Sequence, residues 1–250
     1  MSKLENKVAI VTGASKGIGA SIAKYFAAEG AKVVVNYASS KEGADKIVKE
    51  ITNLGGTAIS IQADVSNEAD VIRLFEETKT AFGKLDILVN NAGIYQYAPI
   101  EQVSVESVHQ HFNINVLGSI LAIREALKLF GDKGGNIINI SSGASNTPLP
   151  TGSVYSATKA ALDAITIALS KEFSGRNIRI NSILPGVVET EGSHSAGFIG
   201  SDFEAKLVAT TPLGRTGQPE DIAKVVFLAS DDAGWITGEK ISVSGGIYGI

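Results

Sequence analysis

The chain has 250 residues, 44% of them hydrophobic and 19% charged, so its length and composition suit a globular protein with one large core. A formal net charge of −4 and the absence of Lys- and Arg-rich runs argue against a nucleic-acid partner and a membrane-surface patch. The chain has no cysteine, which excludes disulfides, thiolate metal ligands and cysteine nucleophiles.

Strand and helix patterns alternate in chain order. Apolar, β-branched runs predict the strands, and apolar residues at helical spacing predict the helices. We expect strands at 8–11, 31–37, 57–65, 84–93 (with the turn that follows), 135–142, 178–186 and 239–246. We expect helices at 20–30, 41–56, 66–83, 104–130, 153–173 and 218–230. In the third helix, Ser66 is the expected N-cap and Gly83 the expected C-terminal stop.

This alternation predicts an α/β fold with a Rossmann-like, doubly wound, seven-stranded parallel sheet covered by helices on both faces. No linker, repeat or low-complexity segment divides the chain, so we expect residues 1–250 to form a single domain. The stretch at about 187–211 is long and weakly periodic. Because ligands bind outside the carboxyl ends of strands in open parallel sheets, we expect this stretch to be a loop over the ligand.

No segment has the properties of a membrane span or a signal peptide. The residues before the first strand contain no apolar stretch of signal-peptide length. No stretch approaches the roughly 18 apolar residues of a membrane-spanning helix. We therefore expect a soluble, cytoplasmic protein with no membrane partner and no nucleic-acid partner.

Three glycines, Gly13, Gly17 and Gly19, lie where the first strand gives way to the first helix. Glycine permits a sharp turn and a close approach of the backbone to a ligand, and a helix N-terminus attracts phosphate. The spacing G-x-x-x-G-x-G differs from both the G-x-G-x-x-G dinucleotide pattern and the P-loop pattern. A tight turn that binds no ligand is therefore the alternative at this point.

Tyr155 and Lys159 are four residues apart in a predicted helix and therefore share one face. A free phenol has a pKa of about 10, and a nearby cation favours the phenolate and lowers that pKa. A tyrosine tuned in this way can exchange a proton with a reacting oxygen. The pair alone is a weak signal, because exposed Tyr and Lys residues are common on helices.

Further short motifs follow the predicted strands. They comprise Thr12-Gly13-x-x-x-Gly17-Ile18-Gly19, Asp64-Val65, Asn90-Asn91-Ala92-Gly93, Asn115, Ser142, Tyr155-x-x-x-Lys159 and Pro185-Gly186. In this order and at this spacing they resemble the short-chain dehydrogenase/reductase family, over essentially the whole chain from Lys7 to Gly246. The resemblance implies one dinucleotide-binding and catalytic domain.

The resemblance implies four catalytic residues. Tyr155 would be the acid for carbonyl reduction and the base for alcohol oxidation, and Ser142 would hydrogen-bond the substrate oxygen. Lys159 would bind the nicotinamide ribose and lower the pKa of Tyr155. Asn115 would support a water molecule in the proton relay. The hydride would move between C4 of the nicotinamide and the substrate carbon.

The resemblance also implies a nicotinamide cofactor held at the ends of the strands. The expected cofactor-binding residues are Gly13, Ser15, Lys16, Gly17, Ile18, Gly19, Asn36, Tyr37, Ala38, Asp64, Val65, Asn91, Ala92, Gly93, Tyr155, Lys159, Pro185, Gly186, Val188 and Thr190.

An acidic residue after the second strand would bind the ribose of NAD and repel the 2′-phosphate of NADP. No carboxylate follows that strand before Glu42, and Lys16 can pair with a 2′-phosphate. The arginine that many NADP-preferring relatives carry at this point is absent. We therefore expect NAD(P)(H), with a preference for NADP(H).

The substrate residues are predicted from position alone. The expected pocket residues are Ser142, Ala144, Tyr95, Leu149, Val187 and His194. The other histidines, His109 and His111, are separated by one residue, do not share a helical face, and are expected at the surface. No histidine pair has zinc spacing, so we predict no metal.

We expect a carbonyl reductase or secondary alcohol dehydrogenase that acts on a small molecule. Two narrower alternatives are a 3-oxoacyl-carrier-protein reductase and a glucose-type sugar dehydrogenase. An acidic carrier protein would need a basic docking patch, for which the candidates are Arg124, Lys128, Lys133 and Lys171. A dinucleotide-sensing regulator without catalysis is a third alternative, disfavoured because all four catalytic residue types are present. From the resemblance we also expect a homotetramer.

Overall fold

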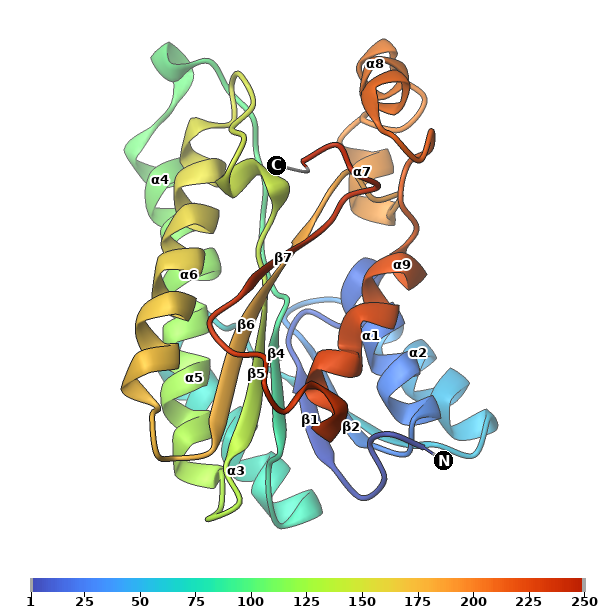
Figure 1. The fold of residues 1–250 in the computed structure, drawn as a ribbon, viewed down its shortest axis with the longest axis vertical. Coiled ribbons are helices and arrows are strands. Elements are labelled where there is room, and N and C mark those ends of the chain that lie inside the picture. The colour runs from blue at the N-terminus through green and yellow to red at the C-terminus, as the bar shows by residue number, and fades with distance from the viewer. Residues whose placement is uncertain (1, 249–250) are drawn as a thin grey trace.

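The computed structural model describes residues 2–248, apart from the side chain of Val226. The described residues form a seven-stranded sheet with the order β3-β2-β1-β4-β5-β6-β7, and every neighbouring pair is parallel (Figure 1). The strands are β1 (Val8–Val11), β2 (Lys32–Tyr37), β3 (Thr57–Gln62), β4 (Ile87–Asn90), β5 (Gly135–Ile140), β6 (Ile178–Pro185) and β7 (Lys240–Val243).

Helices cover both faces of this sheet (Figure 1). On one face lie α1 (Gly17–Ala28), α2 (Lys41–Asn53) and α9 (Pro219–Ala223). On the other face lie α3 (Glu68–Phe82), α4 (Val105–Phe112), α5 (Gly118–Leu129) and α6 (Ser153–Glu172). The predicted doubly wound, parallel α/β fold is therefore confirmed.

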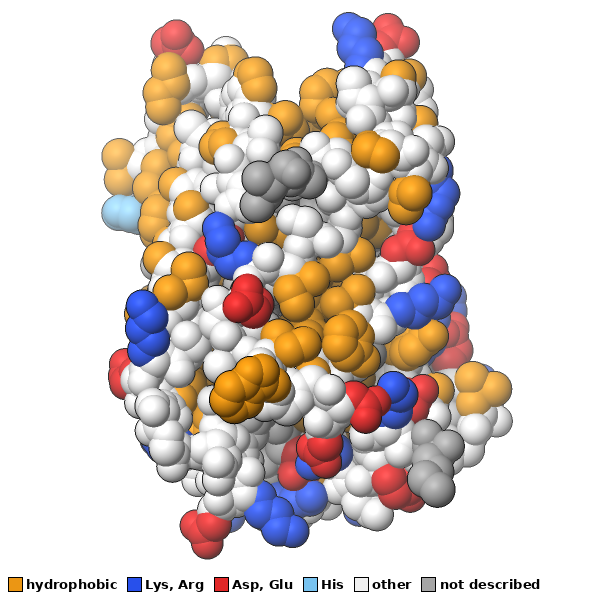
Figure 2. Space-filling view, in the orientation of Figure 1, with side chains coloured by type: hydrophobic (Ala, Val, Ile, Leu, Met, Phe, Trp, Pro, Cys, Tyr) orange, Lys and Arg blue, Asp and Glu red, His pale blue; other side chains and the backbone are white. Residues whose placement is uncertain are grey.

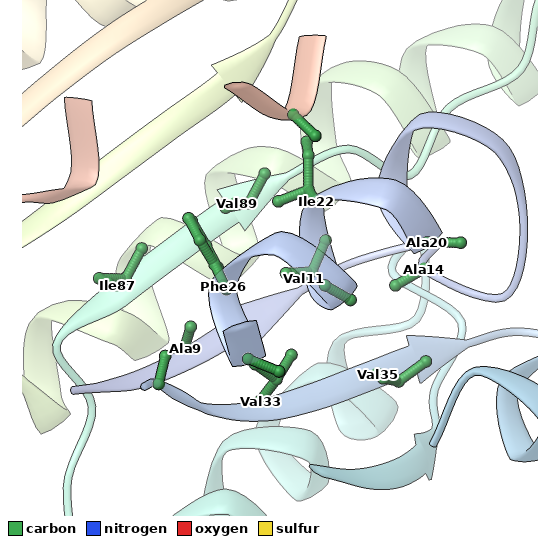
Figure 3. Close-up of a cluster of buried hydrophobic side chains, with 14 of the residues drawn as sticks. Ala9, Val11, Ala14, Ala20, Ile22, Phe26, Val33, Val35, Ile87 and Val89 are labelled. Atoms are coloured by element: carbon green, nitrogen blue, oxygen red, sulfur yellow. The ribbon is translucent and has the colours of Figure 1, made fainter. Parts of the chain in front are cut away.

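Each central strand supplies side chains to two hydrophobic cores because successive side chains point to opposite faces. In β1, Ala9 and Val11 join the core under α1 and α2, while Val8 and Ile10 join the core under α3 and α5. Figure 3 shows the first core, where Phe26 of α1 lies over the sheet. Burial on both faces explains why β1 is apolar throughout rather than alternating.

The structure refines several predicted boundaries. The expected helix 104–130 consists of α4, a π-helical segment at Asn113–Leu117 and α5. The expected loop at 187–211 contains two helices, α7 (Glu191–Ser195) and α8 (Asp202–Thr210). The expected helix 218–230 is α9 followed by a 3-10 helix at Lys224–Ala229.

The predicted N-cap of α3 was wrong by one residue. Asn67, not Ser66, accepts a hydrogen bond at 3.2 Å from the backbone N–H of Asp70. The Ser66 hydroxyl donates instead to Asp64 Oδ1, at 2.7 Å. The predicted stop at Gly83 is confirmed, since this residue adopts the left-handed conformation with φ of 79°.

None of the helices within residues 2–248 combines the length and the apolar character that crossing a bilayer requires.

We predict that Phe26→Ala lowers the free energy of unfolding by about 3–5 kcal/mol, because it leaves a cavity between α1 and the sheet. Phe26 has no exposed surface. Leu54→Ala is the matched control, since Leu54 is 87% exposed and should change stability by no more than about 0.5 kcal/mol. Urea unfolding followed by circular dichroism measures both; equal losses would contradict the described packing.

Candidate active site

The turns that follow β1, β2, β4, β5 and β6 meet at one edge of the sheet because the strands are parallel. They line a cleft of about 560 Å³. The cleft contains every predicted cofactor residue except Gly19 and Tyr37, and every predicted substrate residue except His194. Of the predicted catalytic residues, it contains Ser142, Tyr155 and Lys159 but not Asn115.

The three glycines of the first turn serve different purposes. Gly13 and Gly17 have φ of 61° and 58°, a conformation that favours glycine. Gly19 has an ordinary conformation, but a Cβ there would collide with Asn91 Nδ2 and lie 2.7 Å from Gly13 O. Gly19 therefore packs tightly behind the turn and does not line the cleft, and its contact with a cofactor stays a prediction.

Two asparagines hold the turn. Asn36 Oδ1 accepts a hydrogen bond from Gly13 N at 3.2 Å, and Asn36 Nδ2 donates to the carbonyls of Ile61 and Ala63. Asn91 Nδ2 donates to Thr12 O and Gly13 O at 2.9 and 3.0 Å. The turn after β1 is therefore bonded directly to β2 and to the turn after β4.

Tyr37, predicted to bind cofactor, belongs instead to the hydrophobic core under α1 and α2 and is 8% exposed. It follows Asn36 in β2, so the two side chains point to opposite faces of the strand. The prediction placed all the residues at the end of β2 beside the cofactor. Both faces of β2 are buried, however, and the Tyr37 ring lies in the core.

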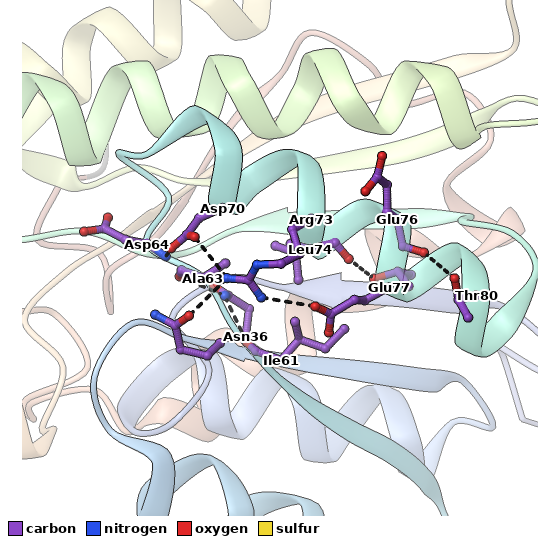
Figure 4. A network of polar contacts seen from close by, with 12 residues as sticks. Asn36, Ile61, Ala63, Asp64, Asp70, Arg73, Leu74, Glu76, Glu77 and Thr80 are labelled. Atoms are coloured by element: carbon purple, nitrogen blue, oxygen red, sulfur yellow. Dashed lines mark hydrogen bonds and ion pairs between the residues drawn. The ribbon is translucent and has the colours of Figure 1, made fainter.

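A polar network fixes the turn after β3, beside Asn36 (Figure 4). Asp64 N donates to Asp70 Oδ2 at 2.9 Å, and Arg73 Nη2 donates to Asp70 Oδ1 at 3.0 Å. The Asp64 backbone N–H, and then the Arg73 guanidinium, hold the pKa of the Asp70 carboxyl below its usual value. This network places Asp64 and Val65 along the cleft.

Tyr155 and Lys159 enter the cleft from α6, with Lys159 Nζ 5.8 Å from the centre of the Tyr155 ring. Lys159 Nζ donates to Ile140 O at 2.8 Å, so the ammonium group is fixed against the end of β5. Burial lowers the pKa of Lys159 to about 8, and the charge of Asp163 raises it against that trend.

Burial raises the pKa of Tyr155 to about 12, and the neighbouring Ser142 hydroxyl works to lower it. This direction is opposite to the lowered pKa expected from the sequence. The Tyr155–Lys159 spacing was correctly interpreted as a shared helical face. Helical spacing does not, however, determine how deeply the phenol is buried. Burial therefore favours the protonated form of the Tyr155 phenol.

Asn115 is 1% exposed, and its side-chain amide hydrogen-bonds the backbone beside the cleft. Its Oδ1 accepts from Ile94 N at 2.9 Å, and its Nδ2 donates to Ile94 O and to Thr158 Oγ1. The side chain thus clamps the segment after β4 onto α6. The support of a relay water by Asn115 stays a prediction.

Aromatic rings that the sequence analysis missed form one wall of the cleft. Tyr97 lies 6.0 Å from Tyr155 and 5.5 Å from Phe198, measured between ring centres. Tyr248 also lines the cleft and packs so tightly against Gly143 that a Cβ there would collide with its ring. The predicted Tyr95 completes the group, 6.2 Å from Tyr155.

The histidines lie away from the reacting groups. His194 does not line the cleft, and its Nε2 is 2.9 Å from Glu189 Oε1, so the structure does not bring it together with the other predicted substrate residues. His111 was wrongly predicted at the surface: it is 1% exposed, and its Nε2 accepts a hydrogen bond from Gln96 N that compensates for its burial. Within residues 2–248, no cluster of His, Asp or Glu side chains could hold a metal ion.

The segment after β6 contacts the glycine turn. Gly17 N donates to Glu191 Oε2 at 3.1 Å, and Thr190, which caps α7, lies beside Gly17. The carboxylate therefore interacts with the positive N-terminal end of α1. Residues 187–193 consequently form one side of the cleft.

Comparison with known proteins identifies the family. A family model described as enoyl-(acyl-carrier-protein) reductase matches residues 13–248. An uncharacterized oxidoreductase of Methylorubrum extorquens is 58% identical, covering 99% of this chain and 100% of the relative. A probable tetrahydroxynaphthalene reductase of Zymoseptoria tritici is 39% identical, covering 98% and 95%.

Solved structures agree in fold. An angucycline C-6 ketoreductase with bound NADP superposes with a TM-score of 0.92 at 36% identity, covering 99% of this chain and 97% of that one. A 7α-hydroxysteroid dehydrogenase complexed with NADH and 7-oxo glycochenodeoxycholic acid gives 0.93 at 34% identity, covering 98% and 95%. The chain belongs to the short-chain dehydrogenase/reductase family and is an oxidoreductase that acts on CH–OH or C=O groups.

We predict that Gly19→Ala lowers the free energy of unfolding by about 1–3 kcal/mol, because the added methyl group displaces Asn91 or the Gly13 carbonyl. Gly131→Ala is the matched control, because a Cβ at Gly131 would meet nothing within 4 Å. That control should change stability by no more than about 0.5 kcal/mol in urea unfolding. A fully stable Gly19→Ala variant would contradict the packing role.

Proposed function

We propose that the chain is an NADP(H)-dependent ketone reductase and, in the reverse direction, a secondary alcohol dehydrogenase. The main supporting observation is that one continuous cleft runs past Lys16, Gly17, Ser142 and Tyr155. A phosphate-binding helix N-terminus and a proton-donating tyrosine therefore face the same cavity.

The residues along the cleft fit a dinucleotide. The N-cap of α1, Lys16, makes no side-chain hydrogen bond to the helix. Gly17 N donates to Glu191 Oε2 in this structure, and a pyrophosphate bound at the first turn would take the place of that carboxylate. A Cβ at Gly93 would lie 3.2 Å from Asn115 Oδ1 and 3.6 Å from Lys159 Nζ. Glycine at this position keeps the approach to the lysine open for the nicotinamide ribose.

The far end of the cleft favours the 2′-phosphate of NADP. Lys16, Ala38, Ser39 and Ser40 line it, and the first acidic residue after β2 is Glu42. A cation and two hydroxyl groups suit a phosphate, whereas an acidic residue would suit a free ribose hydroxyl. The neighbouring solved structures include two NADP complexes and one NADH complex, so they do not decide the preference, which rests on these residues.

In the proposed reaction, a bound NADPH supplies the hydride that reduces the carbonyl carbon. Tyr155 donates its phenolic proton to the carbonyl oxygen, and its pKa of about 12 keeps that proton in place at neutral pH. Ser142 donates a hydrogen bond to the same oxygen as negative charge develops there. The charge of Lys159 stabilises the phenolate that remains after the proton has moved.

We infer an aromatic ketone as the substrate class. Tyr95, Tyr97, Phe198 and Tyr248 line the cleft around Tyr155. Flat aromatic walls suit a flat aromatic ring through edge-to-face and offset contacts. The relative named a probable tetrahydroxynaphthalene reductase supports this inference, because a naphthalene is such a ring.

The structure favours this substrate class over the two narrower alternatives. Two of the candidate carrier-docking residues are already paired, Arg124 with Glu68 and Glu125, and Lys128 with Glu125, so their charges are largely neutralised. A polyhydroxylated sugar would need polar partners that an aromatic wall does not offer. The predicted tetramer and the predicted cytoplasmic location stay predictions.

Hydrophobic side chains gather in the middle of the face shown in Figure 2, between α6 and α9. Trp235 and Phe227, on the segment before β7, are 100% and 42% exposed. An exposed apolar patch of this kind is typical of a subunit contact, which supports the proposed homotetramer.

We predict that Tyr155→Phe lowers kcat for the reduction of an aryl ketone by about 10²–10⁴-fold, because the proton donor is lost. NADPH binding, measured by the change in nicotinamide fluorescence, should stay within about twofold, which shows that the cleft is intact. Tyr25→Phe, a change on α1 outside the cleft, is the control and should keep full activity. A Tyr155→Phe enzyme with wild-type turnover would overturn the assignment.

We predict that Lys16→Glu raises KM for NADPH by about tenfold or more while changing KM for NADH by less than about twofold, because only NADPH carries the 2′-phosphate. Lys49→Glu, which makes the same charge change on the exposed side of α2, controls for overall charge. Steady-state kinetics with both cofactors measure the two ratios. Equal changes for NADPH and NADH would contradict the NADP(H) assignment.

A further inference from the structure

A buried carboxylate, Asp163, lies on the same face of α6 as the reacting groups. It is one helical turn beyond Lys159 and two turns beyond Tyr155. The Asp163 side chain is 5% exposed. Burying a carboxylate costs free energy unless hydrogen bonds or opposite charges compensate for the lost hydration. The partners of Asp163 therefore indicate why a carboxylate is tolerated at this position.

Asp163 is bonded to the turn that carries Ser142. Its Oδ2 accepts a hydrogen bond at 2.6 Å from Ser145 Oγ. Ser145 ends the 3-10 turn Gly143–Ser145, whose N-cap is Ser142. Ser142 Oγ accepts from Ala144 N at 3.1 Å, so the orientation of the Ser142 hydroxyl depends on this short turn. Asp163 therefore connects α6 to the turn after β5.

Lys240 lies close to the Asp163 carboxylate, and Lys159 lies one helical turn away on the same face of α6. Lys240 of β7 places its Nζ 3.9 Å from Asp163 Oδ2, but this Nζ also donates to Asn146 Oδ1 at 2.7 Å. The i, i+4 spacing of Lys159 and Asp163 on α6 brings the carboxylate near the ammonium group. Burial lowers the Lys159 pKa, and the charge of Asp163 raises it against that trend. Asp163 Oδ1 has no hydrogen-bond partner among the described residues, so part of the carboxylate charge is not compensated by hydrogen bonding.

We propose that Asp163 is a positioning residue of the active site, whose carboxylate keeps Lys159 in its ammonium form and, through Ser145, fixes the turn that orients Ser142. Asp163 touches neither the cleft nor the reacting atoms. The proposal rests on the proposed function for the roles of Lys159 and Ser142. The effect of Asp163 on the charge of Lys159 is a property of the protein alone and can be measured without turnover.

The charge effect is tested by NMR titration of the full chain carrying ¹³C-labelled lysine, with the Lys159 signal assigned by its loss in Lys159→Met. Asp163→Asn keeps a carbonyl oxygen that can accept from Ser145 but removes the charge. We expect the Lys159 midpoint to fall by about one pH unit, the effect of removing one nearby opposite charge. Asp202→Asn, on exposed α8, is the control and should leave the midpoint unchanged. An unchanged Lys159 midpoint in a folded Asp163→Asn variant would contradict the proposed effect of Asp163 on the charge of Lys159.

The positioning effect is tested at pH 6, where Lys159 is charged. Ser145→Ala breaks the bond to Asp163 and should lower kcat roughly tenfold, through misplacement of Ser142, without changing the dissociation constant for NADPH. Asp163→Asn should keep most of the wild-type kcat at this pH, whereas Asp163→Ala should match Ser145→Ala. Ser170→Ala, an exposed change on α6, is the control. Wild-type turnover in Ser145→Ala would contradict the proposal that Asp163 positions Ser142 through Ser145. This test remains valid even if Asp163→Asn does not fold.

The two proposals fail in different ways. If Tyr155→Phe remained active, the proposed function would fall while the Lys159 titration could still follow Asp163. If Asp163→Asn left the Lys159 titration midpoint unchanged and Ser145→Ala were fully active, the positioning role of Asp163 would be contradicted. The proposed function would not be affected.

Discussion

The parallel alignment of the strands is the constraint on which the site depends. Since β1, β4, β5 and β6 run in the same direction, the chain leaves each of them at the same edge of the sheet. The side chains of Asn36 and Asn91 then bond the turn after β1 to its neighbours. Residues far apart in the sequence are thereby held in fixed positions along one cleft.

Burial in this cleft sets the chemistry of the two titrating groups in opposite directions. It raises the pKa of Tyr155 to about 12 and lowers that of Lys159 to about 8. Both shifts favour the uncharged form of each side chain. The single buried carboxylate on the same helical face, Asp163, opposes the loss of charge on Lys159, and it is bonded to the turn that carries Ser142. The helix α6 thus carries Tyr155, Lys159 and Asp163 at successive turns of one face.

The fold was predictable because β-branched runs and amphipathic helices alternate strongly, and each pattern depends on short-range spacing. The cleft was predictable because its glycines, Ser142, Tyr155 and Lys159 lie at strand ends or on one helical face. Side-chain direction was not predictable in the same way. Asn115 lies next to the predicted site, yet its amide hydrogen-bonds the backbone of Ile94, and helical spacing did not predict the π-helical segment that contains it.

The substrate wall was the least predictable part. Tyr97, Phe198 and Tyr248 come from three segments that only tertiary packing brings together. Gly19 shows the converse case, where the motif was correctly recognised but one of its residues packs against Asn91 and does not line the cleft. Sequence spacing identifies which residues share a turn or a face, whereas the role of each depends on neighbours distant in the chain.

The most direct test of the account is to follow an isotope through the reaction. The protein is incubated with NADPH carrying deuterium at nicotinamide C4 and with an aryl ketone, and the alcohol is analysed by mass spectrometry. The account predicts one deuterium on the carbinol carbon with one nicotinamide oxidised per alcohol formed, and a strong loss of product in Tyr155→Phe. Oxidation of NADPH without deuterium on that carbon, or no alcohol from any aryl ketone, would contradict it.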